Sequence, residues 1–325
     1  MKLPRKMSLE LTSKCNFRCP YCYCVWHEFP ELGENELSTE EWICVLKKCA
    51  ADGVRDVTFT GGEVFLRKDL WEILKAARQI LPRTRLSIFT NASLMSEEDL
   101  KRLKRMKISV ATSLQGLVSY GAMTGTRRSA RGVLEVLEAA REMGWPIAVS
   151  MTVTKANVGE AEAMFSAAVL SGASGIVMGA MMAEGRGKAH LDLMLEAEEW
   201  EGVKARIRGM KDLGVGYSLC DERVCTCREQ PRQILEKWGE AAKHSLAISA
   251  KRNSKVRGLS TGQKGVKSAA IGKKVCPAGK EFGVVGVDGK FRECLHTVAR
   301  REVGWEKFGV ARAKKGEKGG ESKKS

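Results

Sequence analysis

Three cysteines near the start of the chain have a spacing that can hold an iron–sulfur cluster. Cys15, Cys19 and Cys22 lie in the stretch LELTSKCNFRCPYCY, which begins with a short apolar strand. Cysteine thiolates are the common protein ligands of such clusters, and a four-iron cluster held by three cysteines leaves one iron without a protein ligand. That iron can bind a molecule that then reacts. The stretch therefore predicts a reactive metal centre.

A zinc site and a disulfide are the alternative uses of these cysteines. Structural zinc sites usually place cysteines in close pairs, with a second pair further along the chain. A disulfide is disfavoured because the chain opens MKLPRK and has no apolar run of signal-peptide length before the loop. Cys24 is interpreted as a spectator, since a fourth ligand would close the open position. Cys44 and Cys49 fall on an amphipathic segment and are predicted to be small core residues.

Strands and helices are predicted to alternate along the chain. After the first strand, the predicted strands cover 54–60, 85–90, 108–114, 146–154 and 175–182, and the predicted helices cover 38–52, 69–80, a segment that opens at 96–99, 133–143, 157–170 and 196–213. Ser38 and Ser96 begin capping boxes, and Asp69 is predicted to cap the helix that follows it. This alternation is typical of right-handed βαβ units in a parallel sheet. The predicted fold class is α/β, a partial and open (β/α)6 barrel, with a complete eight-unit barrel as the alternative.

Length and charge favour a soluble, cytoplasmic enzyme. A chain of 325 residues can bury a full core and predicts one large and one small domain. No segment reaches the roughly eighteen apolar residues that span a bilayer. The net charge is +16, but thirteen of these charges come from the segments 243–274 and 312–325. Both segments lack helical periodicity and predict a solvated loop and a disordered tail, so neither a membrane nor a nucleic acid is expected as a partner.

The cysteine spacing and one strand end together resemble the radical S-adenosylmethionine (SAM) superfamily. Tyr21 precedes the last cysteine of the loop, and Gly61-Gly62-Glu63 follows a predicted strand, as the family's GGE motif does. A Gly-Gly-Glu turn alone is also compatible with a purely structural role. The resemblance implies that the three loop cysteines hold a 4Fe–4S cluster with SAM on the open iron. It also implies that Gly61-Gly62-Glu63 binds the SAM amino group and that Tyr21 lies against the adenine.

Two further strand ends carry the resemblance with one departure each. The segment 89–92 resembles the family's Thr-Asn-Gly, with Ala92 in place of the glycine, and 112–116 resembles its Ser-Leu-Asp-Gly, with Gln115 in place of the aspartate. The resemblance implies SAM contacts for Asn91 and Ser113, although Ser113 can equally be a turn residue. An amide at position 115 cannot carry a proton as a carboxylate does. Further matching segments are 123–125, 149–154 and 184–187.

A second group of cysteines lies in the last third of the chain. Cys276 and Cys294 flank a predicted hairpin with an Asp288-Gly289 turn, which brings both sulfurs to one end of the ribbon. This segment resembles the auxiliary-cluster region called SPASM, or its shortened twitch form. The resemblance implies one auxiliary 4Fe–4S cluster, completed by two cysteines from the set Cys220, Cys225 and Cys227. A zinc site and unliganded thiols are the alternatives.

The predicted domains follow from these two cysteine groups. Residues 1–219 form the radical SAM partial barrel, 220–310 form the auxiliary-cluster domain with the basic insertion 243–274, and 311–325 form a disordered basic tail.

The resemblance implies radical chemistry. An external one-electron reductant of ferredoxin or flavodoxin type reduces the cluster, SAM is cleaved to methionine and a 5′-deoxyadenosyl radical, and that radical removes a hydrogen atom from a substrate. Oxidative modification of a peptide or protein is the favoured reaction. Modification of a tetrapyrrole (haem-type) side chain or of a metal cofactor is the alternative. A non-catalytic iron–sulfur electron carrier is the alternative of another class, but it would not need the Gly-Gly-Glu motif or a barrel.

Overall fold

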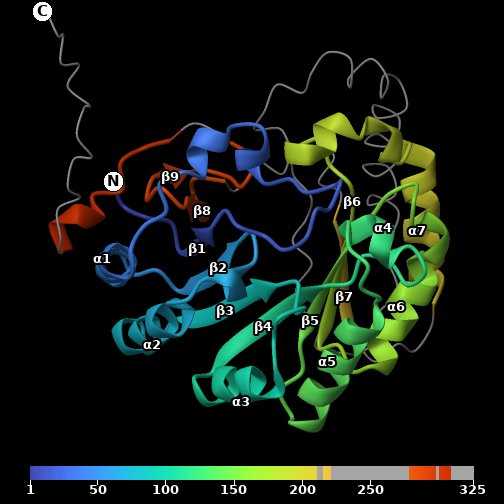
Figure 1. Ribbon diagram of the computed structural model, residues 1–325, viewed down its shortest axis with the longest axis horizontal. Helices are drawn as coiled ribbons and strands as arrows, with labels where there is room; N and C mark the ends of the chain where they lie inside the picture. The colour runs from blue at the N-terminus through green and yellow to red at the C-terminus, as the bar shows by residue number, and fades with distance from the viewer. Residues whose placement is uncertain (211–214, 221–277, 298–299, 309–325) are drawn as a thin grey trace, which may run out of the picture.

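The computed structural model describes residues 1–210, 215–220, 278–297 and 300–308 (Figure 1). A single nine-stranded sheet runs through these residues in the order β7-β6-β5-β4-β3-β2-β1-β8-β9. The strands are β1 (Lys6–Thr12), β2 (Asp56–Gly61), β3 (Arg85–Thr90), β4 (Ile108–Ser113), β5 (Ala148–Val153), β6 (Gly175–Ala180), β7 (Gly216–Cys220), β8 (Phe282–Val285) and β9 (Phe291–Arg292). The α-helices are α1 (Thr39–Asp52), α2 (Leu70–Ile80), α3 (Glu97–Arg105), α4 (Tyr120–Thr124), α5 (Arg131–Glu142), α6 (Ala161–Leu170) and α7 (Ala197–Gly209).

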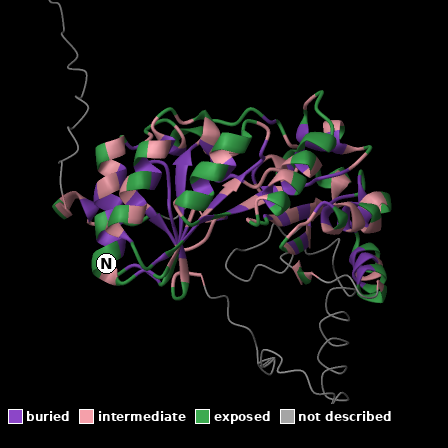
Figure 2. Ribbon diagram, turned by 90° about the horizontal axis from the view of Figure 1, so that it is seen from below, coloured by how far each residue is buried: buried purple, intermediate pink, exposed green. Residues whose placement is uncertain are grey.

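The first six strands form the predicted open (β/α)6 arrangement. Each of them runs parallel to its neighbour in chain order, and β7 continues the series in parallel with β6. The helices that connect them pack on one another in sequence, α1 on α2, α3 on α5, α5 on α6 and α6 on α7. Figure 2 shows buried strands in the interior and helices with exposed outer faces. The α/β fold class and the partial barrel are therefore confirmed.

Local sequence signals account for several helix ends. Ser38 and Ser96 form complete capping boxes at the start of α1 and α3, as predicted. Gly53 ends α1 in the left-handed conformation, at φ 73°. Asp69 is the N-cap residue of α2 as predicted, but its carboxylate caps no α2 N–H group and accepts instead from Arg67 Nε at 2.8 Å and Nη2 at 2.7 Å. A bidentate arginine holds a carboxylate more firmly than a helix N–H group does.

A continuous apolar core lies between the sheet and the helices. It includes Leu9, Phe59 and Ile88 from neighbouring strands, each with no exposed surface. Cys44 and Cys49 of α1 are buried in this core, at 3% and 0% exposure, which confirms their prediction as core residues. In the described part of the chain, no helix has the length and apolar content that crossing a membrane requires.

The C-terminal hairpin extends the same sheet. β8 pairs in parallel with β1, from Lys6 with Phe282 to Leu9 with Val285, and β9 returns antiparallel to β8. The turn is the predicted Asp288-Gly289, with Gly289 at φ 77°. β9 is also tied to β1 by a buried ion pair between Arg292 and Glu10, whose side chains are 3% and 4% exposed. The hairpin thus continues the barrel sheet at the edge formed by β1.

Several predictions fall outside the described residues. Cys225, Cys227 and Cys276, the basic insertion 243–274 and the tail 311–325 are among them. The predicted boundary between 219 and 220 falls within β7, one residue before its end.

Candidate functional site

The three predicted cluster cysteines lie on residues 13–24, here called the cysteine loop, at the carboxyl end of β1. Cys15 is exposed, and Cys19 and Cys22 are half-buried, whereas Cys24 is buried. All four thiols are free. The N–H of Cys22 donates to the Cys19 carbonyl at 3.2 Å, which closes a tight turn between the last two cysteines of the motif. In the described residues, no three His, Cys, Asp or Glu side chains converge on the position of one metal ion.

The pKa values of the cysteine loop show that its sulfurs act on one another. Burial raises the pKa of the Cys19 thiol to about 12, and the negative charges that Cys22 and Cys15 can carry add to the increase. A hydrogen bond with the Cys24 thiol lowers the pKa of Cys22, and His27 contributes in the same direction. Three free thiols that influence one another match the donor chemistry of an iron–sulfur site. Because such ligands bind as thiolates, loading requires loss of protons from them.

The two glycines after β2 are in contact with the backbone of the cysteine loop. A Cβ added at Gly61, where φ is 141°, would lie within 3.0 Å of the Thr12 carbonyl oxygen. A Cβ at Gly62 would overlap the Lys14 carbonyl oxygen in the same way. The N–H of Gly62 donates to Thr12 O at 2.7 Å. The resemblance assigned these glycines to the binding of a ligand. The structure shows in addition that the backbone of the cysteine loop occupies the space that a Cβ would need.

Glu63 is fully buried and fixes the end of β3. Its Oε1 accepts from the Thr90 hydroxyl at 2.7 Å and the Phe65 N–H at 3.1 Å, and its Oε2 accepts from the Asn91 N–H at 2.7 Å. Burial raises its pKa, while these hydrogen bonds lower it by less. Each carboxylate oxygen can accept about two hydrogen bonds. Oε2 therefore accepts one hydrogen bond here, fewer than it can take.

Asn16 is a site residue that sequence reasoning missed. Its Oδ1 accepts from Asn91 Nδ2 at 2.9 Å, its Nδ2 donates to Ser93 Oγ at 2.8 Å, and Ser93 Oγ donates to Asn91 Oδ1 at 2.6 Å. These three hydrogen bonds close a ring between the cysteine loop and the end of β3. Asn91, predicted to contact SAM, therefore also positions the residue next to Cys15. The only sequence signal for Asn16 was its place directly after the first cysteine.

Ala92 keeps the backbone shape that a glycine would take at this strand end. Its φ is 58°, in the left-handed region, and its side chain is 4% exposed. Its N–H donates to the Thr90 hydroxyl at 3.0 Å. Ala92 thus adopts a conformation that favours glycine and adds backbone strain, because a Cβ in this conformation costs about 1–2 kcal/mol.

We expect Ala92→Gly to change the free energy of unfolding by less than about 1 kcal/mol, because relief of strain is offset by the greater freedom of glycine in the unfolded chain. Ala92→Val should instead destabilise the protein by about 1–3 kcal/mol, because a β-branched residue resists this conformation. Urea unfolding of the two variants measures both effects. A stable valine variant, or a glycine variant that loses several kcal/mol, would show that Ala92 is not strained.

The two predicted polar residues at the end of β4 differ in their surroundings. Ser113 is half-buried and pairs with Ser150 of β5 in the ladder. Gln115 is buried, and its Oε1 accepts from the Thr152 N–H at 2.6 Å. Asn157 Nδ2 in turn donates to the Gln115 carbonyl at 2.8 Å. The amide that replaces the family's aspartate therefore holds β4 to β5.

The segment after β6 lies against the other side of the cysteine loop. The N–H of Arg186 donates to Cys22 O at 2.8 Å, and the Gly185 N–H donates to Glu28 Oε1 at 2.7 Å. Glu28 also forms an ion pair with Lys188. The pKa of the Cys15 thiol is raised by burial, and the Arg186 guanidinium opposes this increase. Arg186 thus brings a positive charge to the site. It lies in the matching segment 184–187, for which no role was predicted from the sequence.

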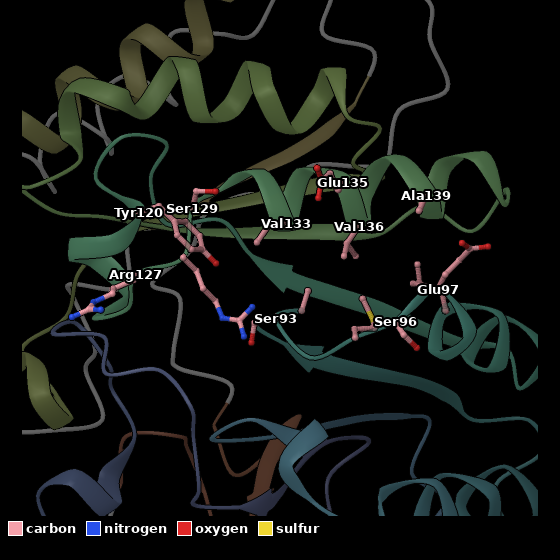
Figure 3. Close-up of a pocket in the computed structure, with 15 residues that line it drawn as sticks. Ser93, Ser96, Glu97, Tyr120, Arg127, Ser129, Val133, Glu135, Val136 and Ala139 are labelled. Carbon is pink, nitrogen blue, oxygen red and sulfur yellow. The ribbon is translucent and has the colours of Figure 1, made fainter.

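The segment 116–131 covers the cysteine loop from a third direction. The N–H of Arg18 donates to Thr124 O at 2.9 Å, and a Cβ added at Gly125, at φ 63°, would lie 2.8 Å from Arg18 O. Phe17 contacts the Tyr120 ring edge-on, with centroids 6.5 Å apart. A groove of about 610 Å³ lies on the far side of Tyr120, between α3 and α5 (Figure 3).

The C-terminal hairpin also touches the cysteine loop. The rings of Tyr23 and His296 meet edge-on, with centroids 5.2 Å apart. Cys294, just before His296, is half-buried. Cys220 ends β7, at the opposite edge of the sheet from the hairpin. Of the five predicted auxiliary-cluster cysteines, the described residues contain only these two.

Comparisons with known proteins agree with this geometry. Residues 9–167 match the radical SAM superfamily. The chain is 32% identical over 161 residues to the sporulation killing factor maturation protein SkfB of Bacillus subtilis, a match that covers 49% of this chain and 38% of SkfB. It is 33% identical over 158 residues to the Fe-coproporphyrin III synthase of Methanosarcina barkeri, a match that covers 48% of this chain and 39% of that protein.

The fold is also similar to that of a solved structure. Streptococcus suis SuiB bound to the precursor peptide SuiA superposes with a TM-score of 0.65 at 13% identity, over 93% of this chain and 63% of SuiB. SkfB and the Fe-coproporphyrin III synthase are each matched over less than half of their own length. The matched region begins in β1 and includes the cysteine loop and the Gly61-Gly62-Glu63 turn. This part of the chain, residues 9–167, is therefore similar to the radical SAM superfamily.

Proposed function

We propose that this chain is a radical SAM enzyme that oxidatively modifies a peptide or protein. The observation that carries the proposal is the cysteine loop, in which three free and accessible thiols follow β1 and the Gly61-Gly62-Glu63 turn packs on the loop backbone. Family members use a 4Fe–4S cluster and SAM. The donor set fits the cluster, since its sulfurs lie outside the core, whereas Cys44 and Cys49 are buried in it.

The proposed ligand set follows the strand ends. Cys15, Cys19 and Cys22 would hold the cluster, and the SAM-binding residues would be Tyr21, Gly61, Gly62, Glu63, Asn91 and Ser113. When bound, the reduced cluster and SAM together supply a 5′-deoxyadenosyl radical that can remove a hydrogen atom from a carbon of the substrate. Cys294, with other cysteines of the C-terminal group, would bind one auxiliary 4Fe–4S cluster.

The chain's own residues hold the loop and exclude water. Glu63 and Asn91 hold the end of β3 against the loop through Asn16. Phe17 and Tyr120, at 4% and 2% exposure, close the flank beside Cys19 with apolar surface. A rigid and dry surround matters because a carbon radical reacts with any hydrogen donor within reach. The external electron would come from a carrier protein of ferredoxin or flavodoxin type.

A peptide substrate is favoured by two of the similar proteins. SkfB is named as the maturation protein of a killing factor, and SuiB was solved with a precursor peptide. The similarity to an Fe-coproporphyrin III synthase supports a tetrapyrrole side chain as the second candidate. The two readings differ in the molecule that gains the modification, so a substrate assay separates them.

Incubation of anaerobically reconstituted protein with SAM and a chemical reductant should release 5′-deoxyadenosine. Quantification of that product by liquid chromatography tests the enzymatic proposal. A protein that binds iron but forms no 5′-deoxyadenosine would be an electron carrier. About eight irons per chain would indicate two four-iron clusters, and about four would indicate one. Addition of candidate precursor peptides, or of an iron porphyrin, then identifies the substrate class by the mass change of the product.

A further inference from the structure

A cluster of unpaired positive charges surrounds one flank of the cysteine loop. Arg18, Arg127 and Arg128 are exposed, and no carboxylate pairs with them among the described residues. The segment 116–131 contains no Asp or Glu. Its remaining cation, Arg131, is already paired with Glu135. We call the three unpaired arginines the basic flank.

The basic flank is in direct contact with the loop that carries the proposed cluster. Thr124 O accepts from the Arg18 N–H at 2.9 Å and lies 4.0 Å from Cys19 Sγ. Arg127 and Arg128 follow Thr124 by only a few residues. The charge of Arg128 is near enough to Tyr120 to lower the pKa of its hydroxyl, against the larger increase that burial causes. The basic flank therefore lies on the protein surface beside Cys19.

The groove beside the basic flank gives this surface a concave shape. Arg127 and Tyr120 lie at one end of the groove and Glu97 at the other (Figure 3). Its floor includes Met95, Val133 and Val136. Positive charge at the end next to the cysteine loop, with a partly apolar floor, suits a protein surface that carries acidic residues around an apolar centre.

The wall between the groove and the cysteine loop decides what kind of partner fits. Phe17 and Tyr120 are almost fully buried, so packed rings lie between the groove and the loop on the Cys19 side. A substrate must bring its reacting atom to the centre, and these rings hinder that on this side. An electron needs only a short path through packed protein. The flank therefore suits an electron donor better than a substrate.

We infer that Arg18, Arg127 and Arg128 form the docking surface for an acidic one-electron carrier protein, an inference that rests on the proposed function. The carrier loses one electron and the cluster gains one, and no bond or proton need be transferred in this step. Opposite charge brings the partners together and fixes their orientation, so docking weakens as salt screens it. Each arginine is thereby a docking residue, without contact to the reacting atoms.

Charge reversal at two of these positions tests the inference. Arg127→Glu/Arg128→Glu is compared with Arg55→Glu/Arg83→Glu, which makes the same change in net charge just before β2 and β3, at the amino ends of the strands, whereas the cysteine loop follows the carboxyl end of β1. Stopped-flow absorbance follows cluster reduction by an acidic flavodoxin in its hydroquinone form. Photoreduced 5-deazaflavin, which is small and uncharged, serves as the second donor.

We expect flavodoxin to reduce the flank variant at least about tenfold more slowly than the wild type at low salt, with the loss shrinking as salt rises. The control variant should stay within about twofold, and deazaflavin should reduce all three proteins equally. Equal slowing of both variants, no slowing, or no reduction of the wild type by flavodoxin would overturn the docking surface. So would weaker binding of a substrate peptide to the flank variant with unchanged reduction.

The proposed function can fail separately. If wild-type protein forms no 5′-deoxyadenosine with SAM and deazaflavin, the enzymatic proposal is wrong, while the reduction rates still report on docking. Iron content of each variant, measured before the kinetics, shows that the loop has kept its cluster.

Discussion

Cys15→Ala, Cys19→Ala and Cys22→Ala should each abolish the formation of 5′-deoxyadenosine from SAM. A cluster held by two thiolates lacks a ligand that no neighbouring side chain replaces, since Cys24, the nearest further cysteine, is buried and hydrogen-bonded to Cys22. Iron content should also fall in each variant, which separates loss of the cluster from loss of SAM binding. The measurement is iron per chain together with deoxyadenosine per chain after anaerobic reconstitution.

Two further cysteine variants serve as controls for this result. Cys44→Ala changes a thiol in the core of α1 and should keep SAM cleavage. Cys294→Ala should keep SAM cleavage but impair product formation, because Cys294 belongs to the proposed auxiliary site. Deoxyadenosine production that persists without one of the three loop cysteines would remove the basis of the cluster assignment.

Arg292→Met should lower the free energy of unfolding by about 3–5 kcal/mol, since it leaves the Glu10 carboxylate buried without a counter-charge. The Glu10 side chain is 4% exposed and has Arg292 as its ion-pair partner. Arg292 also donates to the carbonyls of Leu295 at 3.3 Å and Thr297 at 3.4 Å, so the segment after β9 loses its anchor as well. Urea unfolding of the reduced, metal-free protein measures the loss.

The pH dependence of this variant has a definite sign. Burial already raises the pKa of Glu10 in the wild type, and Arg292 opposes that increase. Without the arginine, the folded protein binds a proton at Glu10 more readily than the unfolded chain does. The variant should therefore be least destabilised at acidic pH and lose stability as pH rises through the elevated pKa of Glu10.

Two comparisons keep this prediction specific to the buried pair. Glu10→Gln/Arg292→Met removes both charges and should recover much of the stability, whereas Arg300→Met breaks a more exposed pair with Asp288 and should cost about 0–1 kcal/mol. A pH-independent loss in Arg292→Met would mean that packing, and not the uncompensated charge, explains the effect.

Regular elements were the part of the fold that local patterns could predict. The strand predicted at 85–90 matches β3, and the capping boxes at Ser38 and Ser96 start helices where expected. These features depend on residues close together in sequence. Helix α4, which none of the predicted helices covers, gave no such signal because it is only five residues long. Its position depends on packing against Phe17, from a distant part of the chain.

The site residues divide in a similar way. Spacing predicted the three loop cysteines and the Gly61-Gly62-Glu63 turn as site residues, and the structure places the turn against the loop. The ring formed by Asn16, Asn91 and Ser93 could not be predicted, since it joins two loops whose approach depends on the curvature of the sheet. From the sequence, Gln115 was predicted only to be unable to transfer a proton as an aspartate can. In the structure, its side-chain oxygen accepts from the Thr152 N–H of the next strand.

The pairing of β8 with β1 has a consequence for how the protein matures in the cell. Phe282 completes the ladder beside Lys6, so one side of β1 stays open until the ribosome has reached β8, more than 200 residues later. An open strand edge offers unpaired N–H and C=O groups to other nascent chains, and contacts between such distant residues form slowly. Metal delivered to the cysteine loop during translation would meet a half-assembled support, which favours cofactor insertion after chain release.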